Sequence, residues 1–143
     1  MSQQVQNQQT PIAHIQEIPA QDACYGELEK TLPENISTYL QNKEIKFYSH
    51  QAEAINKALQ GKNVLIATQT ASGKTLAFNI PVFDALANDS KATALYIYPS
   101  KALTNDQLKV LQETEIGTGI KADSNVYDGD TPKEQRSFIR ENS

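Results

Sequence analysis

Apolar residues recur along the chain with two different periods. Four segments place them three or four positions apart, which is the pattern of one face of a helix. They are residues 32–40, 49–59, 74–87 and 101–113. Ser49 can cap the second helix, and Gly61 stands where a helix end needs positive φ. Pro81 lies inside the third segment and should kink that helix or end it early.

Short apolar runs lie between these helical segments. They occupy residues 63–68 (NVLIAT), 93–98 (TALYIY) and, as a weaker candidate, 125–127. Such runs are typical of strands buried on both faces of a parallel sheet. A last helix should start near Thr131, with Pro132 at its first position and Glu134 completing a capping box. The alternation predicts an α/β fold, a parallel sheet flanked by helices.

Composition divides the chain into two parts. Residues 1–22 are rich in glutamine and poor in large apolar side chains, so we expect a flexible N-terminal arm followed by one domain over residues 23–143. No apolar run approaches the length of a membrane span, no secretory signal is visible, and Cys24 is alone, which favours the cytoplasm. The net charge of -4 gives no general support to nucleic-acid binding, which must therefore be argued from local sites.

A phosphate-binding loop is predicted between the 63–68 strand and the helix after it. Backbone N–H groups and a helix N-terminus would face the same volume there, which favours a polyphosphate anion. By the P-loop pattern, Gly73 allows close backbone approach, Lys74 neutralises the β- and γ-phosphates, and the Thr75 hydroxyl ligates Mg²⁺. The general pattern has glycine where Thr68 stands. The alternative is a plain strand-turn-helix with Lys74 as a solvated charge.

The loop sequence TASGKT, residues 70–75, resembles the first motif of superfamily 2 helicases, which does not need that first glycine. Three further blocks agree in order and spacing: 47–55 is similar to an adenine-recognition motif, 98–103 to motif Ia, and 127–132 to the block that follows it. The branch most similar is that of RecQ-like DEAD/DEAH-box DNA-repair helicases with a C-terminal metal-binding cysteine cluster. The resemblance implies part of a RecA-like P-loop domain that uses ATP and Mg²⁺.

The resemblance also assigns site residues. A glutamine amide can pair with N6 and N7 of adenine at once, although Gln51 could instead be a solvated helix residue. The implied nucleotide contacts are Gln51, Thr70, Ala71, Ser72, Gly73, Lys74 and Thr75, with Thr75 also serving Mg²⁺. The implied contacts to a nucleic-acid backbone, DNA rather than RNA, are Pro99, Ser100, Lys101, Gly129 and Thr131. An ordinary helix cap is the alternative for Ser100, and the acidic pair Asp128 and Asp130 would have to point away from a bound phosphate.

The catalytic acids of a helicase are missing from this sequence. ATP hydrolysis needs an acid to complete the Mg²⁺ site and a group to activate water, and no D-E-x-D/H motif occurs in the chain. We therefore expect the ATP-binding N-terminal portion of a DNA-repair helicase, truncated before that motif and not competent to hydrolyse ATP alone. The alternatives are another P-loop NTPase, such as a small kinase, and a non-catalytic module or decaying gene fragment. Neither His14 nor His50 has ligand partners at metal-binding spacing.

Overall fold

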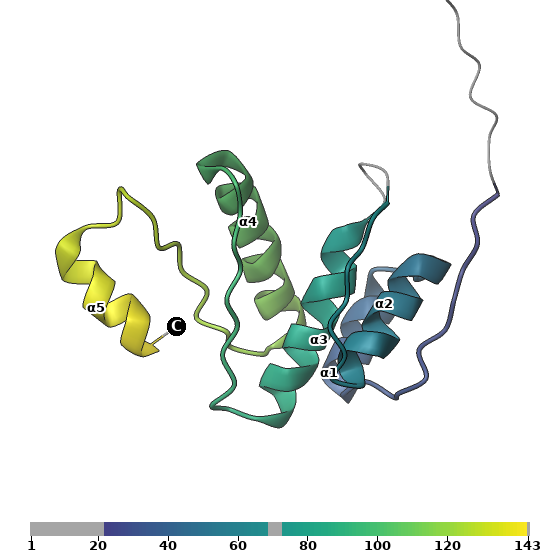
Figure 1. Cartoon of the computed structure of the whole chain (residues 1–143). Helices are drawn as coiled ribbons and strands as arrows, with labels where there is room; N and C mark the ends of the chain where they lie inside the picture. Colours follow the sequence, from purple (N-terminus) through teal and green to yellow (C-terminus); the bar gives the residue numbers. More distant parts are fainter. Residues whose placement is uncertain (1–21, 69–72, 143) are drawn as a thin grey trace, which may run out of the picture.

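The computed structural model describes residues 22–68 and 73–142, and Figure 1 shows their arrangement. Five helices form in this part of the chain: α1 (Glu34–Asn42), α2 (Ser49–Leu59), α3 (Lys74–Asn88), α4 (Lys101–Thr118) and α5 (Lys133–Asn142). The first four correspond to helices expected from the apolar pattern, and α5 corresponds to the helix expected from the capping residues near Thr131. Nearly all of the expected N-terminal arm, 1–21, lies outside the described residues, as do the predicted nucleotide contacts Thr70, Ala71 and Ser72.

Several helix boundaries differ from the sequence-based expectations. The fourth helix continues past its predicted end to Thr118, where Gly119 terminates it with a φ of 71°. The third continues past Pro81 to Asn88, so the early end was wrong. Buried Ala77 and Phe83 lie on either side of the proline, and their packing stabilises both halves of α3. Tyr48, one residue before Ser49, occupies the N-cap of α2.

The core lies between the first four helices. α2 packs against α3, and α1 packs against α4. These contacts bury apolar side chains and so remove apolar surface from water. This burial is the main force that holds the helices together. The buried cluster consists of Leu32, Ile36, Leu40, Ile55, Ile80, Phe83, Leu111 and Ile120.

The predicted strands are not formed in the described part of the chain. Residues 63–68, 93–98 and 125–127 run as extended chain between helices (Figure 1), and the backbone pairing within residues 22–68 and 73–142 is limited to one bridge between Tyr25 and Tyr48. Leu65, Leu95 and Ile97 are 93%, 86% and 85% exposed. A parallel strand needs hydrogen-bonding neighbours and cover on both faces, and these segments lack both here.

No helix in the described ranges is both long and apolar enough to cross a membrane.

The position of the core predicts which phenylalanine contributes most to the free energy of unfolding. Phe83 is 0% exposed, so Phe83→Ala should lower the free energy of unfolding by about 3–5 kcal/mol through lost burial and a residual cavity. Phe138→Ala is the matched control, because Phe138 on α5 is 62% exposed. Urea unfolding followed by circular dichroism measures both. Equal losses for the two variants would contradict the position of the core.

Candidate nucleotide and nucleic-acid sites

Gly73 sits between the predicted phosphate loop and α3. Its φ of 71° and ψ of 28° are left-handed, a conformation that other residues adopt at a cost. A Cβ at this position would also collide with the side-chain amide nitrogen of Gln51. Glycine is therefore required at Gly73 both for its backbone angle and for the close approach of a neighbouring helix.

The Gln51 side chain connects the start of α2 to the start of α3. It is 1% exposed, its Oε1 accepts a hydrogen bond from the Tyr48 backbone N–H at 2.9 Å, and its Nε2 donates to the Gly73 carbonyl at 2.8 Å. The alternative of a solvated helix residue is wrong. Both polar ends of the amide contact backbone in this structure, so a purine that uses Gln51 must share or replace these contacts.

Lys74 and Thr75 are the first two residues of α3, and both are half-buried. The Lys74 ammonium donates to the Thr68 carbonyl at 2.9 Å and to the Thr68 hydroxyl at 3.2 Å. This brings the cation back across the loop to the end of the 63–68 segment. The helix N-terminus adds the positive end of a dipole at the same place. The arrangement has the charge and the donors that a polyphosphate requires.

Three aromatic rings stack beside Gln51, an arrangement that the sequence did not predict. Tyr25 stacks on Tyr48 with ring centroids 5.5 Å apart, and Tyr48 stacks on His50 at 5.9 Å. The isolated bridge aligns Tyr25 with Tyr48, and the backbone N–H of Ser49 donates to Cys24. No local pattern links Tyr25 to this stack, because the contact depends on how the preceding segment folds back.

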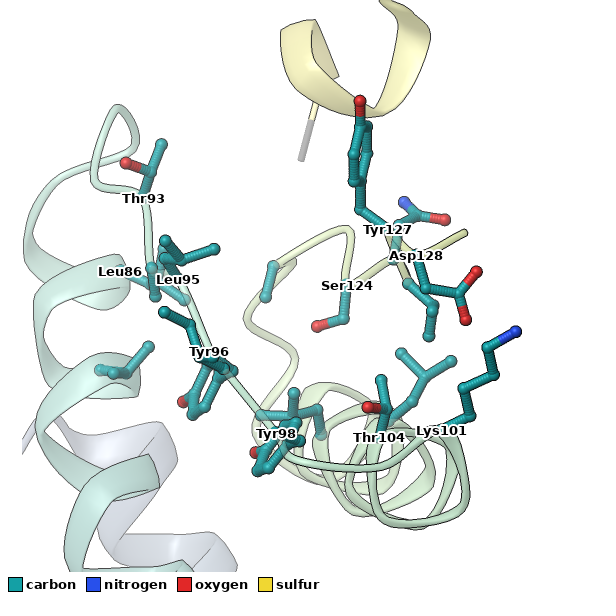
Figure 2. Close-up of a pocket in the computed structure, with 18 of the residues that line it drawn as sticks. Leu86, Thr93, Leu95, Tyr96, Tyr98, Lys101, Thr104, Ser124, Tyr127 and Asp128 are labelled. Carbon is teal, nitrogen blue, oxygen red and sulfur yellow. The ribbon is translucent and has the colours of Figure 1, made fainter. Parts of the chain in front are cut away.

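Ser100 and Lys101 open α4, as the sequence predicted. The Ser100 hydroxyl accepts from the Leu103 N–H at 3.3 Å, so Ser100 is the N-cap of the helix. Pro99 precedes it, exposed, in a bend. The Lys101 ammonium forms an ion pair with Asp130, and this hydrogen bond raises the pKa of Lys101 above its usual value. Lys101 therefore stays cationic, and Figure 2 shows its side chain extending from the start of α4 toward Asp128.

Asp130 belongs to the second predicted nucleic-acid block. Its ion pair with Lys101 brings that block, including Gly129, to the start of α4. Asp130 thus points toward the expected phosphate contact instead of away from it. Thr131 is buried, and its hydroxyl accepts from the Asp128 N–H at 2.9 Å, so it closes the turn instead of making the expected cap of α5. Arg136 reinforces this turn by donating to the Thr131 carbonyl at 2.9 Å.

The described residues contain no group of histidine, cysteine, aspartate and glutamate side chains that could hold a metal ion. Thr75 stays the predicted Mg²⁺ contact, made together with nucleotide phosphates.

Along most of its length the chain is similar to known helicases. The chain is 39% identical to the ATP-dependent helicase HRQ1 of Saccharomyces cerevisiae over 92% of its length, and 35% identical to the uncharacterized ATP-dependent helicase YprA of Bacillus subtilis over 90%. It spans 12% of the first relative and 17% of the second. A crystal structure of the DUF1998 helicase MrfA bound to DNA and AMPPNP matches 86% of the chain and 17% of that protein, with a TM-score of 0.80 and 36% identity.

These likenesses support a helicase domain of the α/β class, although the described residues form no sheet. The family model of the DEAD/DEAH box helicases matches residues 48–143, which include the Gln51 contact, the start of α3 and the start of α4. The chain belongs to the DEAD/DEAH box helicase family.

Proposed function

We propose that this chain is the ATP-binding portion of an ATP-dependent DNA helicase. The observation that carries the proposal is the start of α3, where left-handed Gly73 is followed directly by Lys74 and Thr75. A cation, a hydroxyl and a helix N-terminus converge there, which is the donor set for a nucleotide triphosphate and its Mg²⁺. Thr70, Ala71 and Ser72 complete the proposed loop in the sequence.

In this proposal, different residues contact the phosphates, the Mg²⁺ ion and the adenine base. Lys74 would exchange its contacts with Thr68 for the β- and γ-phosphates, and Thr75 would hold Mg²⁺. Gln51 would read adenine with the amide that now contacts Tyr48 and Gly73. Because one amide serves both the base and the phosphate loop, occupation of the base site and the position of Gly73 are coupled in this proposal.

A second part of the proposal concerns the nucleic acid. Ser100 and Lys101 at the start of α4 would contact a phosphate of the backbone, and the ion pair places Gly129 beside them. Thr131 would act by shaping the turn, and Pro99 by directing the chain into α4. The DNA in the MrfA crystal structure supports DNA over RNA. Service in DNA repair rests on the resemblance to repair helicases.

Binding and hydrolysis are separate in this proposal. The sequence supplies Lys74 and Thr75 but no D-E-x-D/H motif to complete the Mg²⁺ site and activate water. An arginine finger, which contributes about 10³ to 10⁵ in rate where it is used, is not assigned to any residue of the chain. We therefore propose that these 143 residues alone bind ATP and do not turn it over at a helicase's rate.

Lys74→Ala should lower the affinity for Mg²⁺-ATP by about 100-fold or more, because it removes a charge-assisted contact to two phosphates. Lys91→Ala is the control, since Lys91 is an exposed lysine in the turn after α3, beyond the far end of the helix from Lys74. Isothermal titration calorimetry gives both affinities. If the two variants bind ATP equally well, the start of α3 is not the phosphate site.

Lys101→Ala should weaken binding of a single-stranded oligonucleotide and reduce the slope of log affinity against log salt by about 0.7, the contribution of one phosphate contact. Asp130→Asn should instead raise the affinity a few-fold, because the oligonucleotide no longer competes with Asp130 for Lys101. Fluorescence anisotropy across a salt series measures both effects.

Asp106→Asn is the matched control for Asp130→Asn, since it removes one exposed carboxylate that pairs with Lys109 on the same helix. An equal gain from both aspartate variants would mean that net charge alone, and not the release of Lys101, sets the affinity. If Asp130→Asn still raises the oligonucleotide affinity when Lys101 is alanine, the gain does not come from releasing Lys101. That result would also contradict the predicted role of Lys101.

A further inference from the structure

The half-buried side chain of Arg136, on α5, holds the turn formed by residues 128–131. Its Nε donates to the Thr131 carbonyl at 2.9 Å, and its Nη2 donates to the carbonyls of Asp128 and Gly129, each at 3.4 Å. The guanidinium is planar, with its N–H groups in a fixed fork. Because three carbonyls of one turn contact this single rigid group, Arg136 fixes the direction in which they point.

The direction of these carbonyls sets the direction of the N–H groups in the same turn. In a trans peptide the carbonyl and the following N–H point to opposite sides, and no described peptide bond is cis. Since the Asp128 carbonyl faces Arg136, the Gly129 N–H points to the other side of the turn. The next N–H, that of Asp130, donates to the Asp128 carboxylate at 2.8 Å. The Gly129 N–H has no hydrogen-bond partner in the part of the chain that the structure describes.

The space beside Gly129 is open, and a cation lies next to it. Gly129 is exposed, and a Cβ added to it would meet no atom within 4 Å. The following residue, Asp130, forms the ion pair with Lys101. Backbone N–H groups and lysine side chains are both common donors to nucleic-acid phosphates. The turn thus presents an unused donor beside the lysine that is predicted to bind DNA.

Arg136 could alternatively contact a phosphate with its own charge. Its Nε and Nη2 are already directed at the carbonyls of the turn, and the Tyr127 ring lies against the guanidinium, with 5.7 Å between its centroid and Cζ. Arg140, on the same helix, differs: it is exposed, and its Nε donates to the Arg136 carbonyl within α5 at 3.2 Å. The two arginines carry the same charge, but the contacts of Arg136 are those of a group that orients backbone.

We propose that Arg136 is a positioning residue for nucleic-acid binding, which turns the Gly129 N–H outward so that it donates to a backbone phosphate beside Lys101. The inference rests on the proposed nucleic-acid site at the start of α4. It adds a specific donor, the Gly129 N–H, and a residue that directs it without touching the nucleic acid.

The test uses the 143-residue protein in an Asp130→Asn background, so that release of Lys101 from Asp130 cannot itself change the affinity. The matched pair is Arg136→Lys, which keeps the charge but loses the planar fork, and Arg140→Lys, which makes the same change at an exposed site. In fluorescence anisotropy, Arg136→Lys should bind a single-stranded oligonucleotide about tenfold more weakly, because a hydrogen bond to a charged group is lost, and Arg140→Lys should not. The slope of log affinity against log salt should be the same for both, because a neutral N–H releases no counterion.

Amide signals from nuclear magnetic resonance separate positioning from unfolding. In the ¹⁵N-labelled Asp130→Asn protein, a saturating oligonucleotide should shift the backbone amides of Gly129 and Lys101. Arg136→Lys should remove the shift at Gly129, whereas Lys101 still responds. Slow hydrogen exchange at buried Ile36 shows that the variant is folded.

Three results would overturn the inference while leaving the proposed nucleic-acid site in place. If Arg136→Lys binds as tightly as its parent, or if Gly129 still responds in that variant, the guanidinium does not position the donor. If the affinity falls and the salt slope falls by about 0.7, Arg136 contacts a phosphate itself. If Arg140→Lys loses as much affinity, the effect is not specific to the turn. If neither Gly129 nor Lys101 responds in the parent protein, the proposed site fails and this inference fails with it.

Discussion

The buried amide of Gln51 is the contact on which the candidate nucleotide site depends. It pairs with the backbone N–H of Tyr48 and the carbonyl of Gly73, and so connects the N-termini of α2 and α3 through one side chain. Leaving this buried amide unpaired would cost about 1–3 kcal/mol. The Gln51 side chain is therefore held by both hydrogen bonds, one to each helix start. A side chain at position 73 would displace the Gln51 amide and would be strained by the left-handed backbone. The backbone at the end of the predicted phosphate loop is thereby held by a residue of the predicted adenine-recognition motif.

Both candidate sites lie at helix N-termini that the helical core holds in place. α3 packs on α2 through the buried cluster, and α4 packs on α1, so the positions of Lys74 and Lys101 are set by apolar burial far from their charges. In the second site, an acidic side chain already contacts the cation: Asp130 pairs with Lys101. A nucleic-acid phosphate must exchange with this carboxylate. One of the acidic side chains that give the chain its net negative charge is thus paired with the lysine predicted to bind DNA.

Sequence periodicity was sufficient for the first four helices, but the caps expected at Ser49 and Thr131 were wrong. Helical spacing predicted where α1 to α4 lie, and capping residues predicted α5. Gly73, Ser100 and Gly119 occupy the turn or cap positions that their chemistry favours. The partners of these residues could not be predicted. Gln51 and Gly73 are 22 positions apart, and Lys101 and Asp130 are 29 apart, so their contacts arise from packing and not from a local pattern. The strands were expected from apolar runs, but a strand forms only beside another, and 63–68 and 93–98 have no such neighbour among the described residues.

Nuclear magnetic resonance tests whether Gln51 couples the proposed adenine site to the proposed phosphate loop. The ¹⁵N-labelled protein is titrated with Mg²⁺-ATP and, separately, with Mg²⁺-GTP. We expect the backbone amides of Lys74 and Thr75 to shift with both nucleotides, whereas the side-chain amide of Gln51 and the Gly73 amide should shift together and selectively with ATP. A Gln51 side-chain signal that does not move with ATP, or that moves equally with GTP, would contradict it.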